Sequence, residues 1–272
     1  MSLSCLALAA SLGLHGTAAE ERLVTLGGAV TDIVAHLGQG EKIVGIDSTS
    51  TTVELPGEPK ELGFFRRVAP SGVLSLRPTH VLAVDETGPK ELFDLLAKAK
   101  VKVTRVGSPT SVDGAQARIM KIAQALGVEA KGKALVAKMQ ASLDAVQRPA
   151  SKPKVLFVYA RGPGTLLVAG RDTGPESLVR LAGGEFAVSA FEGFKPFSSE
   201  AVLESAPDVL LMTTNGLSSM GGQDGIRKHP VLSKTPAVPA GRIVAIDDLR
   251  LLGFGPDLGE AVKELAEKLD PS

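Results

Sequence analysis

Aromatic and arginine side chains stand together at one point of a chain that has few aromatic residues. Phe64 and Phe65 are followed directly by Arg66 and Arg67, in a sequence with nine Phe, one Tyr and no Trp. Two phenyl rings beside two guanidinium groups suit a large planar ligand that carries carboxylates, because a guanidinium group binds a carboxylate through paired hydrogen bonds. The alternative interpretation is that one ring packs in the core while both arginines are solvated.

A second group of this kind lies at 159–164, where the sequence reads YARGPG. The run VLFVYA at 155–160 predicts a strand, and alternation along it places Tyr159 and Arg161 on one face, where the strand ends. Ligands of open α/β sheets bind beside the carboxyl ends of strands, so both side chains are candidate ligand contacts. A packed tyrosine beside a surface arginine is the alternative.

Patterns typical of catalysis are missing. The four histidines do not have the spacing of a zinc site, and Cys5 is the only cysteine. There is no G-x-S-x-G motif, and GPG at 162–164 lacks the third glycine of a dinucleotide-binding fingerprint. With 30 basic and 30 acidic residues, the chain has no overall field that attracts nucleic acid. We therefore expect a binding protein that is not an enzyme and does not bind nucleic acid.

The N-terminus has features of an export signal. Residues 3–14, LSCLALAASLGL, are apolar but too short to span a bilayer. Thr17 and Ala19 have the −3 and −1 spacing of a signal-peptidase site. We expect a signal peptide at 1–19, truncated at its start because the basic n-region is missing. A buried N-terminal helix is the alternative.

Strand-like and helix-like runs alternate along the rest of the chain, which is the pattern of an α/β fold. Expected strands cover 22–26, 42–47, 79–84, 101–106, 155–160, 208–213 and 242–247. Apolar residues at helical spacing predict one helix at 119–127 and a longer one at 129–146. We predict two Rossmann-like lobes joined by a single long helix: an N-terminal lobe at 20–112, a helical segment at 113–150 that contains the joining helix, and a C-terminal lobe at 151–272.

The two halves share a local repeat. SGVLSLRPTHVLAV at 71–84 superposes on SEAVLESAPDVLLM at 199–212, with proline in the same place. Each segment predicts a short helix that ends before a proline and leads into a buried strand. Such steps are common in α/β proteins, but together with the long helix they favour two similar lobes with a ligand cleft between them.

Four longer stretches then carry a resemblance that covers nearly all of the chain after residue 19: LGFFRRVAPSGVLSLRPTHVLA, VLFVYARGPGTLLVAGRDT, EGFKPFSSEAVLESAPDVLLM and DDLRLLGFGPDLGEAV. In their order and spacing the sequence resembles the periplasmic haemin-binding proteins of bacterial ABC importers, the HmuT/ShuT/PhuT type of the helical-backbone (class III) substrate-binding proteins. The resemblance implies a periplasmic monomer that holds haem between two lobes, closes little on binding, and delivers the haem to a permease dimer.

The resemblance also assigns roles to single residues. Members of this family have a tyrosine in an L-G-Y-x-R motif that ligates the haem iron, and here that place is Phe64, which cannot ligate. Arg66 matches the arginine of the motif and suits a haem propionate. In the C-terminal motif, Arg250 stands where many relatives have a tyrosine. Tyr159 is the remaining phenol, and we expect it to be the substitute iron ligand.

Docking to the permease in this superfamily uses one acidic residue on each lobe. Glu200 provides it in the C-terminal lobe, but the matching place in the N-terminal lobe is Ser71. Either Glu200 docks with help from a neighbour such as Glu86, or the partner is different. Cobalamin, a siderophore or another ferric chelate is the alternative ligand, and a degenerate module that does not transport is the alternative function.

Overall fold

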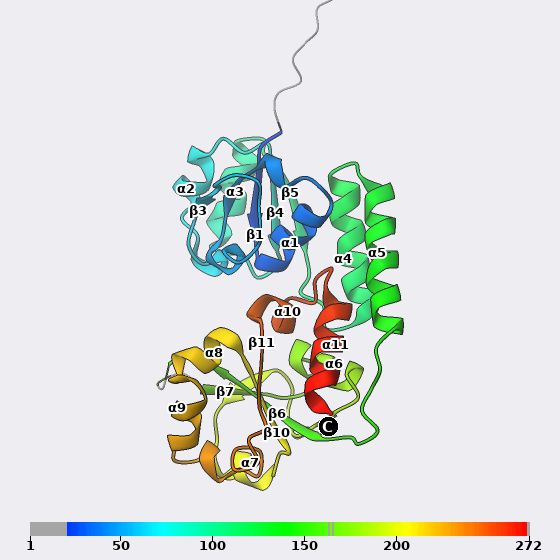
Figure 1. Cartoon of the computed structure of the whole chain (residues 1–272). Helices are drawn as coiled ribbons and strands as arrows, with labels where there is room; N and C mark the ends of the chain where they lie inside the picture. Colours follow the sequence, from blue (N-terminus) through cyan, green and yellow to red (C-terminus); the bar gives the residue numbers. More distant parts are fainter. Residues whose placement is uncertain (1–20, 163, 165, 271–272) are drawn as a thin grey trace, which may run out of the picture.

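The computed structural model describes residues 21–162, 164 and 166–270, so the predicted signal peptide at 1–19 lies outside the described residues. Two α/β lobes stand one above the other and are linked along one side by a pair of helices (Figure 1). The predicted fold class is confirmed. No helix within the described ranges combines the length and the apolar character needed to cross a membrane.

The N-terminal lobe is built on a five-stranded parallel sheet in the order β3-β2-β1-β4-β5. Its strands are β1 (Leu23–Leu26), β2 (Ile43–Ile46), β3 (Lys60–Glu61), β4 (His80–Val84) and β5 (Lys102–Val106). Its helices are α1 (Gly28–His36), α2 (Pro70–Ser75) and α3 (Lys90–Lys98), with 3-10 turns η1 (Gly40–Lys42), η2 (Ser48–Ser50) and η3 (Phe65–Arg67). The central strands β1 and β4 are buried throughout, as expected of parallel strands covered on both faces.

The C-terminal lobe has a mixed sheet in the order β11-β10-β6-β7-β9, with β8 also paired to β6. Its strands are β6 (Lys154–Ala160), β7 (Leu166–Ala169), β8 (Glu185–Phe186), β9 (Phe194–Pro196), β10 (Val209–Thr213) and β11 (Ile243–Ile246). The strands β6, β8, β10 and β11 are parallel, whereas β7 and β9 add an antiparallel extension. The helices are α6 (Gly174–Leu181), α7 (Ser199–Glu204), α8 (Thr214–Ser219), α9 (Gly222–Lys228), α10 (Asp248–Gly253) and α11 (Leu258–Leu269), with the 3-10 turn η4 (Leu232–Lys234).

The connection between the lobes consists of α4 (Val112–Ala125) and α5 (Glu129–Asp144), which pack against each other. The chain breaks between them at Gly127, whose φ of 68° lies in the left-handed region that glycine adopts readily. The long helix expected at 129–146 is therefore α5, and α4 lies along it instead of leaving it alone between the lobes. Helix α5 also packs against α11 of the C-terminal lobe.

The repeat found in the sequence extends to the backbone. Helix α2 leads into β4 and α7 leads into β10, each through a residue that precedes proline and has a positive φ: 48° at Arg77 and 39° at Ala206. Val73 and Val202, which are equivalent, are both buried in their lobes. Ser71 and Glu200 consequently occupy the same place, the second position of a short exposed helix, in the two lobes.

The lobes are joined most firmly by a buried arginine of α4. The Arg118 side chain reaches the C-terminal lobe, where its Nη2 donates hydrogen bonds to the carbonyl oxygens of Gly253 (2.5 Å) and Phe254 (2.6 Å). Burial lowers the pKa of Arg118 to about 10, and the charges of Asp32 and Glu86 oppose that shift. The guanidinium group is therefore still charged at neutral pH, and both hydrogen bonds are charge-assisted.

Arg118→Ala is expected to lower the free energy of unfolding by about 3 kcal/mol, because it leaves two buried carbonyl groups without their donor. Urea unfolding followed by circular dichroism measures this loss. Arg148→Ala is the matched control, since Arg148 also donates to a carbonyl oxygen, that of Leu181, but is exposed. An equal loss in the two variants would contradict the role given to Arg118.

Candidate ligand site between the lobes

The carboxyl ends of strands from both lobes point toward the space between them. Helix α1 starts at the end of β1, and α10 follows the end of β11 in the other lobe. The two helices approach closely at Gly28, where an added Cβ would lie 3.1 Å from Leu249 Cδ1. An added Cβ would also collide with the carbonyl oxygen of Thr49 in the same lobe, so the absence of a side chain at Gly28 permits both approaches.

A buried carboxylate shapes the N-terminal side of the cleft. Asp47 accepts hydrogen bonds from the backbone N–H of Gly27 (2.8 Å) and from both the N–H (3.0 Å) and the hydroxyl (2.7 Å) of Thr49. A further bond comes from the hydroxyl of Ser50 at 2.8 Å. Four donors compensate for the burial of this charge. They also hold the loop after β2 against the start of α1.

Phe64, Phe65, Arg66 and Arg67 lie where β3 ends, within and just before η3. The two phenyl rings touch, with centroids 4.6 Å apart, and the guanidinium carbon of Arg66 stands 5.4 Å from the centroid of the Phe65 ring. Phe65 is half-buried and packs against two hydrophobic clusters, one of which extends into the C-terminal lobe, whereas Phe64 keeps 36% of its surface exposed. The expected packing of one ring and the expected exposed platform therefore both occur, each on a different phenylalanine.

Neither arginine of this group is used by the fold. Arg66 and Arg67 are exposed, and among the described residues no carboxylate forms an ion pair with either of them. The turn itself is held by the backbone, since the N–H of Gly88 donates to the carbonyl oxygen of Phe65 at 3.0 Å. Two guanidinium groups are thus free to bind an anionic ligand.

Tyr159 and Arg161 form a closed pair at the end of β6. The Nε of Arg161 donates to the phenol oxygen of Tyr159, and its guanidinium carbon lies 5.5 Å from the centroid of the phenol ring. The Tyr159 ring packs edge-on against Phe194, with centroids 6.4 Å apart. Phe194 is 43% exposed, and the sequence analysis did not identify it. An exposed phenylalanine two strands away from Tyr159 gives no signal before the sheet order is known.

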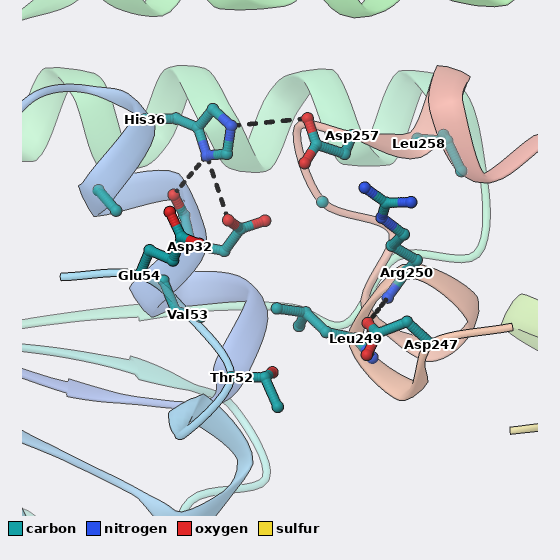
Figure 2. Close-up of a pocket in the computed structure, with 12 residues that line it drawn as sticks. Asp32, His36, Thr52, Val53, Glu54, Asp247, Leu249, Arg250, Asp257 and Leu258 are labelled. Carbon is teal, nitrogen blue, oxygen red and sulfur yellow. Dashed lines mark hydrogen bonds and ion pairs between the residues drawn. The ribbon is translucent and has the colours of Figure 1, made fainter. Parts of the chain in front are cut away.

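A cavity of about 620 Å³ lies between residues of α1 and the loop after β2 in one lobe and residues 247–258 of the other. Figure 2 shows residues of α1 and of the loop at 52–54 on one side of it, and residues of α10 and the segment after it on the other. None of the predicted site residues lines this cavity. Arg250, which the sequence analysis noted only as a replacement for a family tyrosine, does line it.

His36 joins the two sides of this cavity. Its Nδ1 lies 3.1 Å from Asp32 Oδ1 on α1, and its Nε2 lies 3.5 Å from Asp257 Oδ1 in the other lobe (Figure 2). Hydrogen bonds to Asp257 and Asp32 raise the pKa of His36 to about 10, and the same contact with His36 lowers the pKa of Asp257. The sequence analysis considered the histidines only as zinc ligands, and nothing near His36 in the sequence indicates its partner 221 positions away.

Within the described ranges, no group of three or more His, Cys, Asp and Glu side chains is arranged to hold a metal ion. The aromatic rings, guanidinium groups and phenol of residues 64–67, 159 and 161 are the side chains that the sequence analysis predicted as ligand contacts. The predicted site residues form two pairs of neighbours, Phe64–Phe65 with Arg66 and Tyr159 with Arg161, one on each lobe.

The stabilising effect of His36 is expected to decline in alkaline solution. Its pKa is higher in the folded chain than the ordinary 6.5, so its contribution is complete below about pH 6.5 and is lost as pH rises through about 10. We expect the free energy of unfolding of the wild type to exceed that of His36→Gln by about 1–2 kcal/mol at pH 7, a modest value because solvent partly screens this half-buried pair. At pH 10.5 the difference is expected to be almost zero. Urea unfolding at both pH values measures the difference.

His229→Gln is the control for this experiment. Burial lowers the pKa of His229, so this residue is neutral across the whole alkaline range. Any difference between wild type and His229→Gln should therefore be the same at pH 7 and pH 10.5. A constant difference for His36→Gln as well would contradict the charged state assigned to His36.

Comparisons with known proteins agree with this architecture. The family model described as periplasmic binding protein matches residues 23–249. The apo form of the periplasmic heme-binding protein RhuT from Roseiflexus sp. RS-1 is similar over 92% of this chain and 97% of that chain, with 40% identity and a TM-score of 0.87. The periplasmic heme-binding protein HutB of Vibrio cholerae is similar over 93% of this chain and all of that chain, with 32% identity and a TM-score of 0.84.

A curated relative is more distant. The uncharacterized ABC transporter substrate-binding lipoprotein YvrC of Bacillus subtilis (strain 168) is 26% identical over 263 residues, which cover 92% of this chain and 80% of YvrC. The family match spans most of the chain, and two solved structures exceed 30% identity over nearly all of it. The resemblance inferred from the sequence is confirmed, and the chain belongs to the periplasmic binding protein family.

Proposed function

We propose that this chain is an exported, periplasmic protein that captures haem between its lobes and delivers it to an ABC importer. The observation that carries this proposal is the similarity to RhuT, which includes 40% identity over 92% of the chain. The arrangement of the cleft is in keeping with it. Each lobe contributes an aromatic group and at least one arginine, and haem is a planar, apolar ring with two carboxylates.

In this proposal haem is the transported cargo, and the protein acts by binding and not by catalysis. Arg66, Arg67 and Arg161 bind the propionates, and Phe64 and Phe65 contact the ring. The chain acts as a monomer and docks onto a permease dimer, with no role for nucleic acid. Its division at 20–112, 113–150 and 151–272 gives one lobe for each side of the haem and a stiff connection between them.

Tyr159 is proposed as the iron ligand. It is the only tyrosine of the chain, and Phe64 has no atom that can ligate iron. The Arg161 guanidinium group donates a hydrogen bond to the phenol oxygen, and a tyrosine oxygen is a known ligand of haem iron. The same Phe64 favours a second candidate, cobalamin or a ferric chelate, because such a ligand needs no protein atom on its metal.

Titration of the purified protein with haemin is expected to give a saturable Soret shift and the absorption bands of a tyrosinate–iron complex. Tyr159→Phe is expected to bind haemin without those bands, because no other phenol is present. Absorption spectroscopy measures both. Tyr159→Phe contains no phenol. Identical spectra of the wild type and this variant would therefore show that another group is the axial ligand.

Two further variants test the arginines. Arg66→Ala is expected to weaken haemin binding about tenfold, the effect of losing one charge-assisted hydrogen bond, whereas the exposed control Arg148→Ala leaves it unchanged. A complete absence of saturable haemin binding by wild type would overturn the haem proposal. A parallel titration with cobalamin then decides for or against the second candidate.

Docking on the permease is assigned to Glu200, with Ser71 at the equivalent place. Both side chains are exposed at the second position of α7 and α2. Glu200→Gln is expected to slow haem uptake by vesicles that contain the cognate permease roughly tenfold, without change in haemin affinity, because it removes one charge from the rim of the interface. Glu204→Gln, one turn further along the same exposed helix, is the control. Equal uptake by wild type and Glu200→Gln would remove Glu200 from the docking surface.

A further inference from the structure

A row of charged side chains that alternate in sign passes the cavity, and the members of the row that line it are Asp32, His36, Arg250 and Asp257. Asp32 contacts His36 at 3.1 Å, and His36 contacts Asp257 at 3.5 Å. Beyond this point Arg250 contacts Glu264 at 3.4 Å. The row starts at Arg118, which lies close enough to Asp32 to feel its charge, and it ends at Lys268, 2.6 Å from Glu264. The row therefore crosses from one lobe to the other.

One link of the row makes that crossing. Among the ion pairs of the described residues, only His36–Asp257 joins a side chain of the N-terminal lobe to one of the C-terminal lobe. Both ring nitrogens of His36 face carboxylates, so a neutral ring would place a nitrogen lone pair against an anion. The contact is thus between an imidazolium ring and two carboxylates.

This link lies at the cavity itself, because His36 lines the cavity from one lobe and Asp257 lines it from the other. Helix α1 touches the C-terminal lobe near both of its ends, through Gly28 at Leu249 and through His36 at Asp257. Between them Gly255 approaches Asp32 so closely that a Cβ on Gly255 would lie 3.0 Å from Asp32 Oδ2. Figure 2 shows the cavity lined along this stretch of α1. The His36 contact therefore lies at the opposite end of α1 from the contact at Gly28.

We propose that His36 and Asp257 form a clasp that, together with Arg118, fixes the angle between the lobes and thereby controls how quickly a ligand leaves the space between them. The clasp keeps the site preformed in the free protein, so little binding energy is spent on bringing the lobes together. Breaking the clasp allows the lobes to separate while each lobe stays folded. The part of the proposal that concerns the ligand rests on the proposed haem-binding function.

The charges around the clasp come from every element packed against it. Asp32 lies on α1 itself, Glu54 projects from the loop at 52–54, and Arg250 lies on α10. Lys138 on α5 lies close enough to stabilise the negative charge of Asp257. Three cations therefore lower the pKa of Asp257: His36, which has the largest effect, then Arg250 and Lys138. Removal of His36 leaves Asp257 without its nearest partner.

The distance between the lobes of the ligand-free protein tests the clasp directly. Spin labels are attached to cysteines placed at Ser75 on α2 and Ser199 on α7, both exposed, with Cys5 changed to serine. Electron–electron double resonance is expected to give one narrow distance distribution for wild type. His36→Leu and Asp257→Asn are each expected to broaden it and shift it to longer distances, and the double variant to broaden it no further.

Lys42→Met is the matched control, because Lys42 forms an ion pair with Glu21 at 2.8 Å that lies wholly within the N-terminal lobe. It is expected to leave the distribution unchanged. Asp257→Asn preserves the size and shape of the side chain, so it keeps the test valid where His36→Leu fails to fold. Distributions of wild-type width and position in both clasp variants would overturn the proposal.

A kinetic measurement tests the effect on the ligand. Haemin-loaded protein is mixed with an excess of an apo haem scavenger, and transfer is followed by absorption. His36→Leu is expected to release haemin roughly fivefold faster, as for the loss of one partly exposed ion pair. Equal release rates for wild type and His36→Leu would contradict the proposal that the clasp limits the rate of ligand release. If wild type binds no haemin, the proposed function fails, whereas the distance measurement still decides whether the clasp exists.

Discussion

The buried guanidinium group of Arg118 is the contact on which the arrangement of the lobes depends. It binds two successive carbonyl groups at the end of α10, where Phe254 has a φ of 48°, an unfavourable conformation for a residue other than glycine. The buried Phe254 side chain and the two hydrogen bonds together compensate for that strain. Because α10 carries Leu249 and Arg250 at the cavity, the position of the cavity wall follows from an arginine that does not line the cavity.

Rigid positioning of the lobes has a direct consequence for binding. The α4–α5 pair runs along one side of the two lobes (Figure 1), and Arg118 and the contact at Gly28 add further connections to the C-terminal lobe. Phe64 and Arg66 at the end of β3 are held by backbone contacts, and Arg161 is held by Tyr159. Under the proposed function, the lobes need not be brought together when a ligand binds, so less entropy is lost on binding.

The sequence predicts the elements far better than it predicts their contacts. Expected strands at 79–84 and 208–213 agree within a residue with β4 and β10, because continuous apolar runs between prolines and turns are local signals. The break at Gly127 is local in the same sense. By contrast, Arg118 acts on residues 135 and 136 positions away, and His36 acts on Asp257. Nothing in the neighbourhood of either residue identifies these partners, so both contacts become visible only in the folded chain.

Phe64 and Ser71 stand in the N-terminal lobe where the resemblance implies a tyrosine and a glutamate. Together with the internal repeat, these two replacements indicate which functional groups each lobe provides. Ser71 and Glu200 are equivalent in the backbone, so the charge of the expected docking pair is confined to the C-terminal lobe by a change of side chain and not of structure. The same holds for the phenol, since Phe64 removes it from the N-terminal lobe and Tyr159 supplies the only one in the C-terminal lobe. What the N-terminal lobe retains is apolar surface and two arginines without an ion pair among the described residues, groups suited to the ring and the carboxylates of a ligand but not to its metal. Under the proposed function, selection for a metal therefore depends on the C-terminal lobe, and a fixed angle between the lobes is needed to bring that lobe's phenol to a ring held by the other.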